Sequence, residues 1–152
     1  MSKIRNYASA VAVPVLLGAA VGLLTMGSMD YDTLVQPPLS PPGWLFPIVW
    51  TILYVLMGLS YGMIRETGKP ESAVSLLYYV QLGVNLLWPI AFFVLKWRLF
   101  AFFWLLLLDI LVLLMLFLFY RKNKTSGLLQ LPYAVWVVFA TYLNLSVYLL
   151  NR

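Results

Sequence analysis

Long apolar stretches alternate with short polar links along this chain, and the pattern predicts membrane-spanning helices. Each stretch has about 20 residues, the length that an α-helix needs to cross the hydrocarbon core of a bilayer. Helices are required there because lipid offers backbone N–H and C=O groups no hydrogen-bond partner. We therefore predict an all-α integral membrane protein, a five-transmembrane-helix bundle that forms a single domain over residues 1–152. The predicted spans are 7–26, 44–64, 75–95, 99–120 and 128–150.

Composition favours the same class of protein. The chain is 63% hydrophobic and only 10% charged, whereas about a quarter of the residues of a soluble domain are charged. The first stretch is expected to be a retained helix, because its apolar run exceeds the roughly 7–15 residues of a signal peptide. The chain has no cysteine and no histidine, which excludes disulfides, Cys/His zinc sites and histidine-ligated haem. No metal site and no required cofactor are expected.

The ten Lys and Arg residues are unevenly divided between the two ends of the predicted bundle. By the positive-inside rule, the larger group places the N-terminus in the cytoplasm, with the first link and the C-terminus outside, in a bacterial or similar inner membrane. The net charge of +5 is small and lies at helix ends, so nucleic acid is not an expected partner. The cytoplasmic group is Lys3, Arg5, Arg65, Lys69, Arg121, Lys122 and Lys124, and the outer group is Lys96, Arg98 and Arg152.

A proline-rich link precedes the second predicted span. Residues 37–42 read PPLSPP, and a stiff, extended connector is expected because proline fixes φ and lacks a backbone N–H. Ser40 is expected to cap the helix that follows. Trp50 and Tyr54 then share one face of that helix, and the connector and this face together predict one wall of a flat, apolar pocket. The alternative is a proline-capped helix whose aromatic residues only pack.

Two further spans carry aromatic and amide side chains on one face. Amides in lipid need partners, so Asn85 and the face it shares with Trp88 should point into the bundle. Pro89 is expected to bend the third span. In the fifth span the small Ala140 leaves room beside the indole of Trp136. The two complete faces are Tyr78, Gln81, Asn85, Trp88 and Phe92, and Tyr133, Trp136, Ala140 and Asn144.

The three inward faces each present one indole ring. Trp50, Trp88 and Trp136 are predicted to converge on a site for a flat conjugated ligand, through stacking and edge contacts. The alternative is that tryptophans anchor the protein at the membrane interface. That alternative suits Trp44, Trp97 and Trp104.

Three smaller features each allow two interpretations. Asp109 is a carboxylate deep in a span, and it is either a polar group or proton relay of the pocket or a hydrogen-bonding group that locks the fourth helix against a neighbour. The pairs Gly18/Gly22 and Gly58/Gly62 serve either helix packing inside the bundle or homodimerisation. Near the end of the chain, a weak pattern proposed for sterol contact competes with an ordinary interfacial helix end. Its residues are Leu145, Tyr148 and Arg152.

Four stretches, taken in order, cover nearly the whole chain: PPLSPPGWLFPIVWTILYVLMG, QLGVNLLWPIAFF, LLLLDILVLL and LLQLPYAVWVVFATYLNLSVYLLN. As a set they resemble the TspO/translocator protein family, also called peripheral benzodiazepine receptors or tryptophan-rich sensory proteins. The resemblance implies a five-helix bundle with a pocket under the first link, and a homodimer. It also implies binding of porphyrins, of haem-pathway intermediates, and of isoquinoline-carboxamide and benzodiazepine drugs, and animal members also bind cholesterol.

The resemblance also implies particular site residues. Trp50 and Trp136 match the two tryptophans implicated, in some members, in light- and oxygen-dependent breakdown of protoporphyrin IX. The pocket-lining positions of the family are matched by Tyr31, Asn85, Trp88 and Ala140. The family commonly has Lys-Pro-Ser-Trp, or a similar sequence, before the Pro-Pro pair. This chain has neither the basic nor the aromatic residue between Gln36 and Ser40, so the resemblance does not extend to that part of the link.

Three functions follow as alternatives. The first is a membrane protein that binds or transports porphyrins, or senses them. The second is light- and oxygen-dependent degradation of protoporphyrin IX, in which Trp50 and Trp136 would be the catalytic residues. The third is a protein that responds to cholesterol or membrane lipids and has no tetrapyrrole role.

Overall fold

A computed structural model describes residues 2–152, and every regular element in that range is helical. Five helical segments are long and apolar enough to cross a membrane, which confirms the predicted all-α five-helix bundle. The last of these segments consists of a short helix followed by a long one. The helices are α1 (Lys3–Thr25), α2 (Leu45–Glu66), α3 (Ser72–Pro89), α4 (Arg98–Lys122), α5 (Lys124–Leu129) and α6 (Leu131–Asn151).

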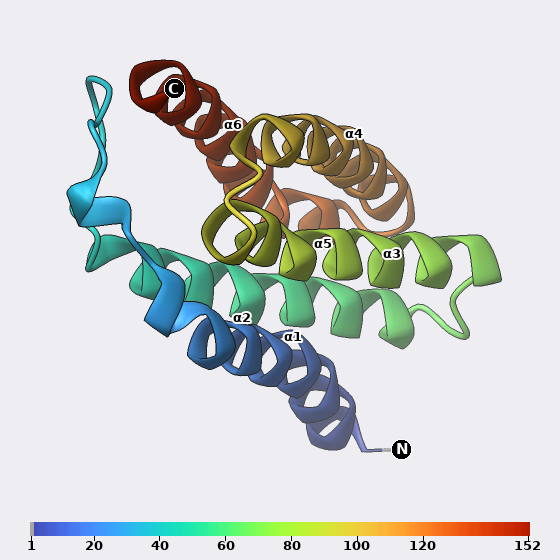
Figure 1. Ribbon diagram of the computed structural model, residues 1–152. Helices are drawn as coiled ribbons and strands as arrows, with labels where there is room; N and C mark the ends of the chain where they lie inside the picture. The colour runs from blue at the N-terminus through green and yellow to red at the C-terminus, as the bar shows by residue number, and fades with distance from the viewer. Residues whose placement is uncertain (1) are drawn as a thin grey trace.

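α2, α3, α4 and α6 form the main body of the bundle, and α1 lies on its outside (Figure 1). α1 packs mainly on α2, whereas α4 packs on both α3 and α6. The first span is also the least buried of the five, because only 17% of the residues in its most apolar 18-residue stretch are buried inside the bundle. The core is formed by side chains such as Met57, Leu108 and Tyr133, which are fully buried between the other helices.

The fifth predicted span, 128–150, is interrupted in the structure. It consists of α5 and α6, which are separated at Gln130. Pro132 has no N–H to donate to the carbonyl of Leu128, so the hydrogen-bond pattern of α5 cannot continue into α6. The side chain of Asn123 begins α5 by accepting a 3.1 Å hydrogen bond from the backbone N–H of Ser126.

The third span changes its helical form at Pro89. α3 ends at this residue, and the chain continues as a π-helical turn, η3 (Ile90–Val94). The N–H of Leu95 closes this turn by donating to the carbonyl of Ile90 over 2.9 Å. Proline breaks the regular ladder, and a wider turn is one way for the chain to satisfy the freed groups.

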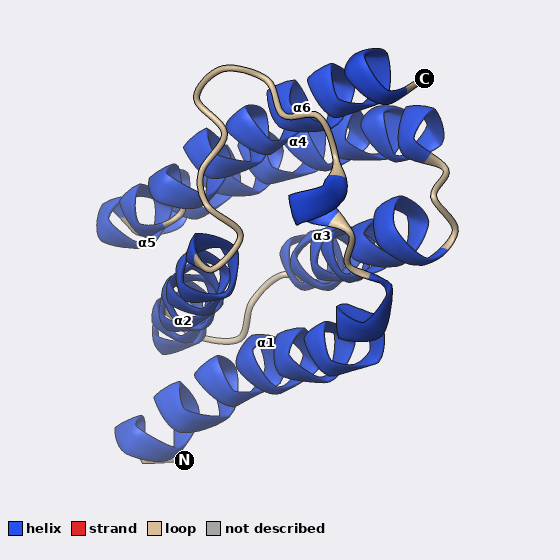
Figure 2. Ribbon diagram, turned by 60° about the vertical axis from the view of Figure 1, so that its left-hand side comes forward, coloured by secondary structure: helices blue, strands red, loops and turns tan. Residues whose placement is uncertain are grey.

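The first link differs from the stiff, extended connector that the sequence predicts. Within residues 37–42, for which the connector is predicted, Leu39 adopts a positive φ of 71° in a tight turn, so this stretch is not extended throughout. Two 3₁₀ turns, η1 (Met26–Ser28) and η2 (Tyr31–Thr33), precede it in the link. The prediction that Ser40 caps the next helix is wrong. Its hydroxyl donates to the carbonyl of Pro37 over 2.8 Å, and α2 begins only at Leu45. In Figure 2 this link runs from the end of α1 through short blue helical turns and then as a long tan loop to the start of α2.

Glycines set the distance between α1 and α2. A Cβ at Gly58 would collide with the backbone of α1 at Val11, and a Cβ at Gly62 would collide with the ring of Tyr7. Gly18 lies against the ring of Tyr54 in the same way, whereas no atom of another residue lies within 4 Å of the position of a Cβ at Gly22. Three of the four glycines therefore act in packing inside the bundle.

Candidate functional site

A chain of polar side chains crosses the middle of the bundle and centres on Asn85. The hydroxyl of Tyr54 donates to Asn85 Oδ1 over 2.6 Å, and Asn85 Nδ2 donates to the hydroxyl of Tyr133 over 2.7 Å. The hydroxyl of Tyr133 in turn donates to Gln81 Oε1 over 2.8 Å. α2, α3 and α6 are thus joined by side chains that are satisfied by one another, as groups removed from water require.

The spacing of α3 explains why these groups meet. Gln81 and Asn85 are four residues apart, so they lie one turn above each other on one face of the helix. Both side chains are buried, which agrees with the inward orientation that their amides predict. Gln81 also donates a 2.8 Å hydrogen bond to the backbone carbonyl of Tyr78.

Trp50 lies above this network on α2. Its ring centroid is 5.8 Å from that of Tyr54 and 6.4 Å from that of Tyr133, with an edge-to-face geometry in the second pair. Trp50 is half-buried and packs against the main core. Trp50 is therefore packed beside the two tyrosines of the network.

Trp88 joins α3 to α6 through a second polar contact. Its indole Nε1 donates to Asn144 Oδ1 over 2.9 Å, and Asn144 Nδ2 donates to the backbone carbonyl of Arg98 over 2.8 Å. The ring of Trp88 also stacks on that of Phe92, with centroids 5.1 Å apart. The donor and acceptor groups of Trp88 and Asn144 are thus used within the protein, which leaves the ring faces of Trp88 for apolar contacts.

Trp136 contacts the first link through an aromatic series. The centroid of Trp136 is 5.9 Å from that of Phe46, and the centroid of Phe46 is 4.9 Å from that of Tyr31, both edge to face. The indole Nε1 of Trp136 is buried and has no hydrogen-bond partner among residues 2–152. A buried donor of this kind is costly to leave unpaired, so an acceptor on a ligand would stabilise the site.

Tyr31 is held in place by the link itself. Its hydroxyl donates to the backbone carbonyl of Pro41 over 2.8 Å. Partial burial raises the pKa of Tyr31 above its ordinary value, while a hydrogen bond with Ser40 opposes this increase and the nearby carboxylate of Asp32 adds to it. Tyr31 therefore stays neutral at physiological pH and remains a hydrogen-bond donor.

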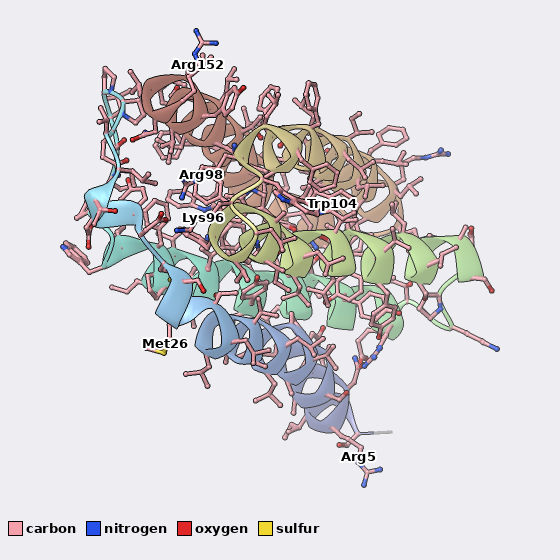
Figure 3. All side chains as sticks on the ribbon, in the orientation of Figure 1. Arg5, Met26, Lys96, Arg98, Trp104 and Arg152 are labelled. Atoms are coloured by element: carbon pink, nitrogen blue, oxygen red, sulfur yellow. The ribbon has the colours of Figure 1, made fainter. Side chains whose placement is uncertain are left out.

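The first link is fastened to the rest of the bundle at three places. At one, Arg98 Nη2 contacts both carboxylate oxygens of Asp30, over 2.9 and 2.7 Å (Figure 3 labels Arg98 beside the link). At the second, the side-chain amide of Asn151 accepts from the N–H of Val35 and donates to its carbonyl, each over 2.9 Å. The hydroxyl of Tyr142 adds a 2.7 Å bond to the carbonyl of Pro38. The link is therefore held over the same end of the bundle as Trp136.

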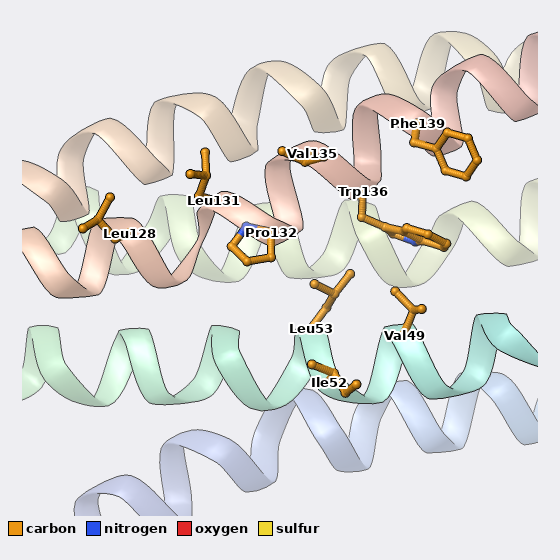
Figure 4. A pocket seen from close by; sticks show the side chains of 9 residues that line it. All are labelled: Val49, Ile52, Leu53, Leu128, Leu131, Pro132, Val135, Trp136 and Phe139. Carbon is orange, nitrogen blue, oxygen red and sulfur yellow. The ribbon is translucent and has the colours of Figure 1, made fainter. Parts of the chain in front are cut away.

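A groove of about 770 Å³ lies between α2, α5 and α6 (Figure 4). Its lining includes Trp136 but neither Trp50 nor Trp88. In Figure 4 the indole of Trp136 points from α6 towards Val49 on α2, while Phe139 lies one turn further along α6. Trp136 thus has one side on this groove and another near Phe46 and the first link.

Residues 10–150 match the family model of the TspO/MBR family. The chain belongs to this family. The tryptophan-rich protein TspO of Archaeoglobus fulgidus is 38% identical over 154 residues, which cover 99% of each chain. The tryptophan-rich protein TspO of Chlorobaculum tepidum is 40% identical over 127 residues, 82% of this chain and 80% of that protein. The translocator protein of Ovis aries is 35% identical over 118 residues, 75% of this chain and 70% of that protein.

As a member of the TspO/MBR family, this chain is an integral membrane protein. The structure places the predicted site residues as follows. Tyr54 and Asn85 are joined by a hydrogen bond, and Trp50 lies beside Tyr54. Trp136 is connected to Tyr31 through Phe46. Ala140, one turn after Trp136, is buried against the main core. Trp88 packs at the boundary of the two apolar clusters of the bundle.

Asp109 and the sterol pattern have separate surroundings. Asp109 Oδ2 lies 2.8 Å from the hydroxyl of Thr141 on α6, which favours the interpretation that Asp109 joins α4 to α6. No group of metal-binding side chains lies together within residues 2–152. Leu145 and Tyr148 are half-buried on one face of α6, and Arg152 is exposed at its end.

Sequence reasoning missed the residues that hold the first link. The sequence identifies Arg98 only as one of the outer cations and does not single out Asn151, because their partners are 68 and 116 residues away. Trp104 is also better explained by the structure, since its indole N–H donates to the carbonyl of Val84 over 2.8 Å. Trp44 and Trp97 are exposed, as interfacial anchors would be.

Proposed function

We propose that this protein binds a planar, apolar, conjugated molecule of the porphyrin class under its first link, and that it transports or senses such molecules in the membrane. The observation that carries the proposal is the aromatic series from Tyr31 through Phe46 to Trp136, in which the indole N–H has no acceptor within residues 2–152. Flat conjugated rings bind well to aromatic side chains. Isoquinoline-carboxamide and benzodiazepine ligands would use the same surfaces.

A titration of the purified protein with protoporphyrin IX tests the proposal. We expect saturable quenching of tryptophan fluorescence, with a Kd that rises at least severalfold in Trp136→Phe and Trp50→Phe. Trp97→Phe is the matched control, because Trp97 is an exposed tryptophan at the same end of the bundle. Quenching that does not saturate, or that changes equally in all three variants, would contradict binding at this site.

The same complex distinguishes binding from turnover. Under illumination in air, degradation would bleach the porphyrin and give a new product, whereas the argon control would stay unchanged because dioxygen is the oxidant. Loss of the product in both Trp50→Phe and Trp136→Phe would favour the enzymatic alternative. Equal slow bleaching in the wild type and the variants would leave binding, transport or sensing as the function.

The third alternative depends on the end of α6. If a sterol rather than a porphyrin is the ligand, sterol binding should disappear in Arg152→Ala while protoporphyrin IX causes no saturable quenching. Arg152 is exposed at the end of the helix that carries Leu145 and Tyr148. Sterol binding that persists in Arg152→Ala would show that this pattern is not needed for sterol recognition.

We further propose that the N-terminus is cytoplasmic in a bacterial cell membrane, with the first link and C-terminus outside, and that the protein is a homodimer. Lys3, Arg65 and Lys122 are at helix ends of one side, whereas Arg98 and Arg152 are at helix ends of the other. The rule counts Lys and Arg residues, so the larger group favours a cytoplasmic N-terminus. Because the chain has no cysteine, Lys69→Cys and Asp32→Cys each provide one site for an impermeant maleimide. In intact cells only Asp32→Cys should react.

A further inference from the structure

A second groove lies on the outside of the bundle, between the N-terminal half of α1 and α2. It has a volume of about 820 Å³, and apart from Lys3 its lining is almost wholly apolar. Its lining includes Lys3, Ala8, Ala12 and Leu16 along α1, and Val55 and Leu59 on α2. None of these residues belongs to the proposed porphyrin site.

The packing of α1 on α2 explains why this surface is hollow. Gly58 and Gly62 let α2 approach the backbone of α1 closely. Ala8 and Ala12 are small side chains beside that contact, so the two helices touch along one line and leave a depression next to it. The depression faces outward, where Ala8 and Leu16 are exposed.

The length of the groove corresponds to one leaflet of a bilayer. From Lys3 to Leu16 there are thirteen helical steps, which at about 1.5 Å each amount to roughly 20 Å. Half of the hydrocarbon core is about 15 Å thick. The groove thus runs from the membrane surface, where Lys3 begins α1, to about the middle of the bilayer. One acyl chain of a lipid in that leaflet covers the same depth.

Positive charge is available at the surface end of the groove. Neither Lys3 nor the neighbouring Arg5 takes part in the ion pairs found within residues 2–152, and the first turn of α1 has no acidic residue. The nearby carboxylate of Glu66 is 2.7 Å from Asn6 Nδ2 and accepts its hydrogen bond. The groove between α2, α5 and α6 has no charged residue in its lining, so of these two grooves the one on α1 is suited to select a lipid by its headgroup.

We propose that this groove binds an anionic phospholipid of the surrounding bilayer. Its acyl chain lies along Ala8 and Ala12 between α1 and α2, and its phosphate contacts the ammonium group of Lys3. A cation near an anionic lipid surface contributes about 1 kcal/mol, equivalent to roughly fivefold in affinity. The protein therefore retains phosphatidylglycerol in preference to phosphatidylcholine at this groove.

A single label tests the proposal, because the chain has no cysteine. Leu16→Cys carries a fluorescent probe at the deep end of the groove, and the full-length protein is placed in nanodiscs of phosphatidylcholine. Two parallel samples then receive the same amount of either phosphatidylglycerol or phosphatidylcholine. Each of the two lipids carries a nitroxide near the end of its acyl chain. We expect phosphatidylglycerol to quench the probe severalfold more effectively.

Matched variants separate the headgroup from the groove. Lys3→Ser should abolish the preference, whereas Lys69→Ser removes the same charge from the same end of the bundle and should leave it. Ala8→Phe should fill the groove and lower quenching by both lipids, whereas Ala20→Phe, at an exposed alanine of α1 outside the groove, should not. Lys3→Ser alters only a surface charge, so the test does not depend on Ala8→Phe folding.

Three results would overturn the proposal. One is equal quenching by the two lipids in the wild type. Another is a preference that Lys3→Ser and Lys69→Ser reduce by the same factor, which indicates only a general surface charge. The third is weak quenching by both lipids together with efficient disulfide formation between unlabelled Leu16→Cys chains, which indicates that a second copy of the protein covers the groove.

Discussion

Individual polar side chains join the helices of this bundle by hydrogen bonds, and Asn85 is the clearest case. It accepts from Tyr54 on α2 and donates to Tyr133 on α6, so one amide connects three helices. In lipid no water can replace a lost partner. The same amide that stabilises the fold also positions the tyrosines beneath Trp50, which ties stability to the proposed site.

Replacing Asn85 by Leu should therefore lower the free energy of unfolding. Two interhelical hydrogen bonds are lost, and at about 0.6–1.7 kcal/mol for each such bond, the expected cost is about 1–3 kcal/mol. Thermal or denaturant unfolding in detergent measures it. Tyr54→Phe should cost less, and the double variant should show less than the sum of the two effects, because both remove the same bond. Full additivity would show that the bond contributes nothing.

Glu71 provides a prediction at the surface of the protein. The hydrogen bond from Lys122 Nζ, over 2.8 Å, and the positive charge of that group hold the pKa of Glu71 below its ordinary value, against a small opposing effect of burial. The ion pair therefore stabilises the fold above the unfolded-state pKa of Glu71, and this contribution is lost as the pH falls through the lower folded-state value.

An NMR titration of the Glu71 carboxyl group should give a midpoint below the ordinary value in the wild type. In Lys122→Met the midpoint should return towards that value, because both the hydrogen bond and the charge are gone. Lys69→Met removes a cation from the same end of the bundle and should have little effect. A midpoint that is the same in the wild type and in Lys122→Met would show that the pair does not form in solution.

At the scale of elements, close approach between α1 and α2 depends on glycine. The backbone of α1 occupies the space that a side chain at Gly58 would need, so the contact cannot adapt by rotating a side chain. α1 is otherwise little buried. The position of α1 consequently depends on its close contact with α2 at Gly58 and Gly62, and on the hydrogen bond from Asn6 Nδ2 to the carbonyl of Gly62.

Gly58→Leu should displace α1 and destabilise the protein by at least about 1–3 kcal/mol, the usual range for an overpacked site. Gly83→Leu is the control, because a Cβ at Gly83 meets no neighbouring atom within 4 Å, and its effect should stay within about 0.5 kcal/mol. Unfolding midpoints and proteolysis of α1 measure both variants. Similar midpoints for the two would refute close packing at Gly58.

At the scale of the whole molecule, the first link connects parts of the bundle that are far apart in sequence. Asp30 contacts Arg98, which begins α4, and Val35 is bound by Asn151 at the end of α6. The link is thus held against two different helices, over the end where Trp136 and Phe46 meet. Any ligand that enters from this end must pass the link or displace one of these contacts.

Arg98→Gln should loosen the link without unfolding the helices. The pair with Asp30 is partly exposed to solvent, so about 1 kcal/mol is expected from its loss, equivalent to roughly fivefold faster amide exchange of the link. Hydrogen exchange followed by mass spectrometry measures this for residues 30–36. Arg152→Gln removes an exposed cation from the same end and should not change the exchange. Equal amide protection of residues 30–36 in Arg98→Gln and Arg152→Gln would show that the Asp30–Arg98 pair does not hold the link in place.

Much of this architecture follows from local pattern. Apolar stretches of about 20 residues determine the number of spans and the helical class, because a chain in lipid must satisfy its own backbone groups. The inward orientation of Gln81 and Asn85 follows from their spacing and from the cost of amides in lipid. These properties depend only on neighbours in the sequence and on the solvent.

Other features were decided only by tertiary structure. The contacts of Asp30 with Arg98 and of Val35 with Asn151 join positions 68 and 116 residues apart, and no local pattern specifies which distant groups meet. The tight turn at Leu39 and the free indole N–H of Trp136 likewise depend on how the link lies on the bundle. The sequence by itself determined the helices and their inward faces, whereas packing in three dimensions decided which side chains those faces bring together, because a hydrogen bond requires proximity in space rather than in the chain.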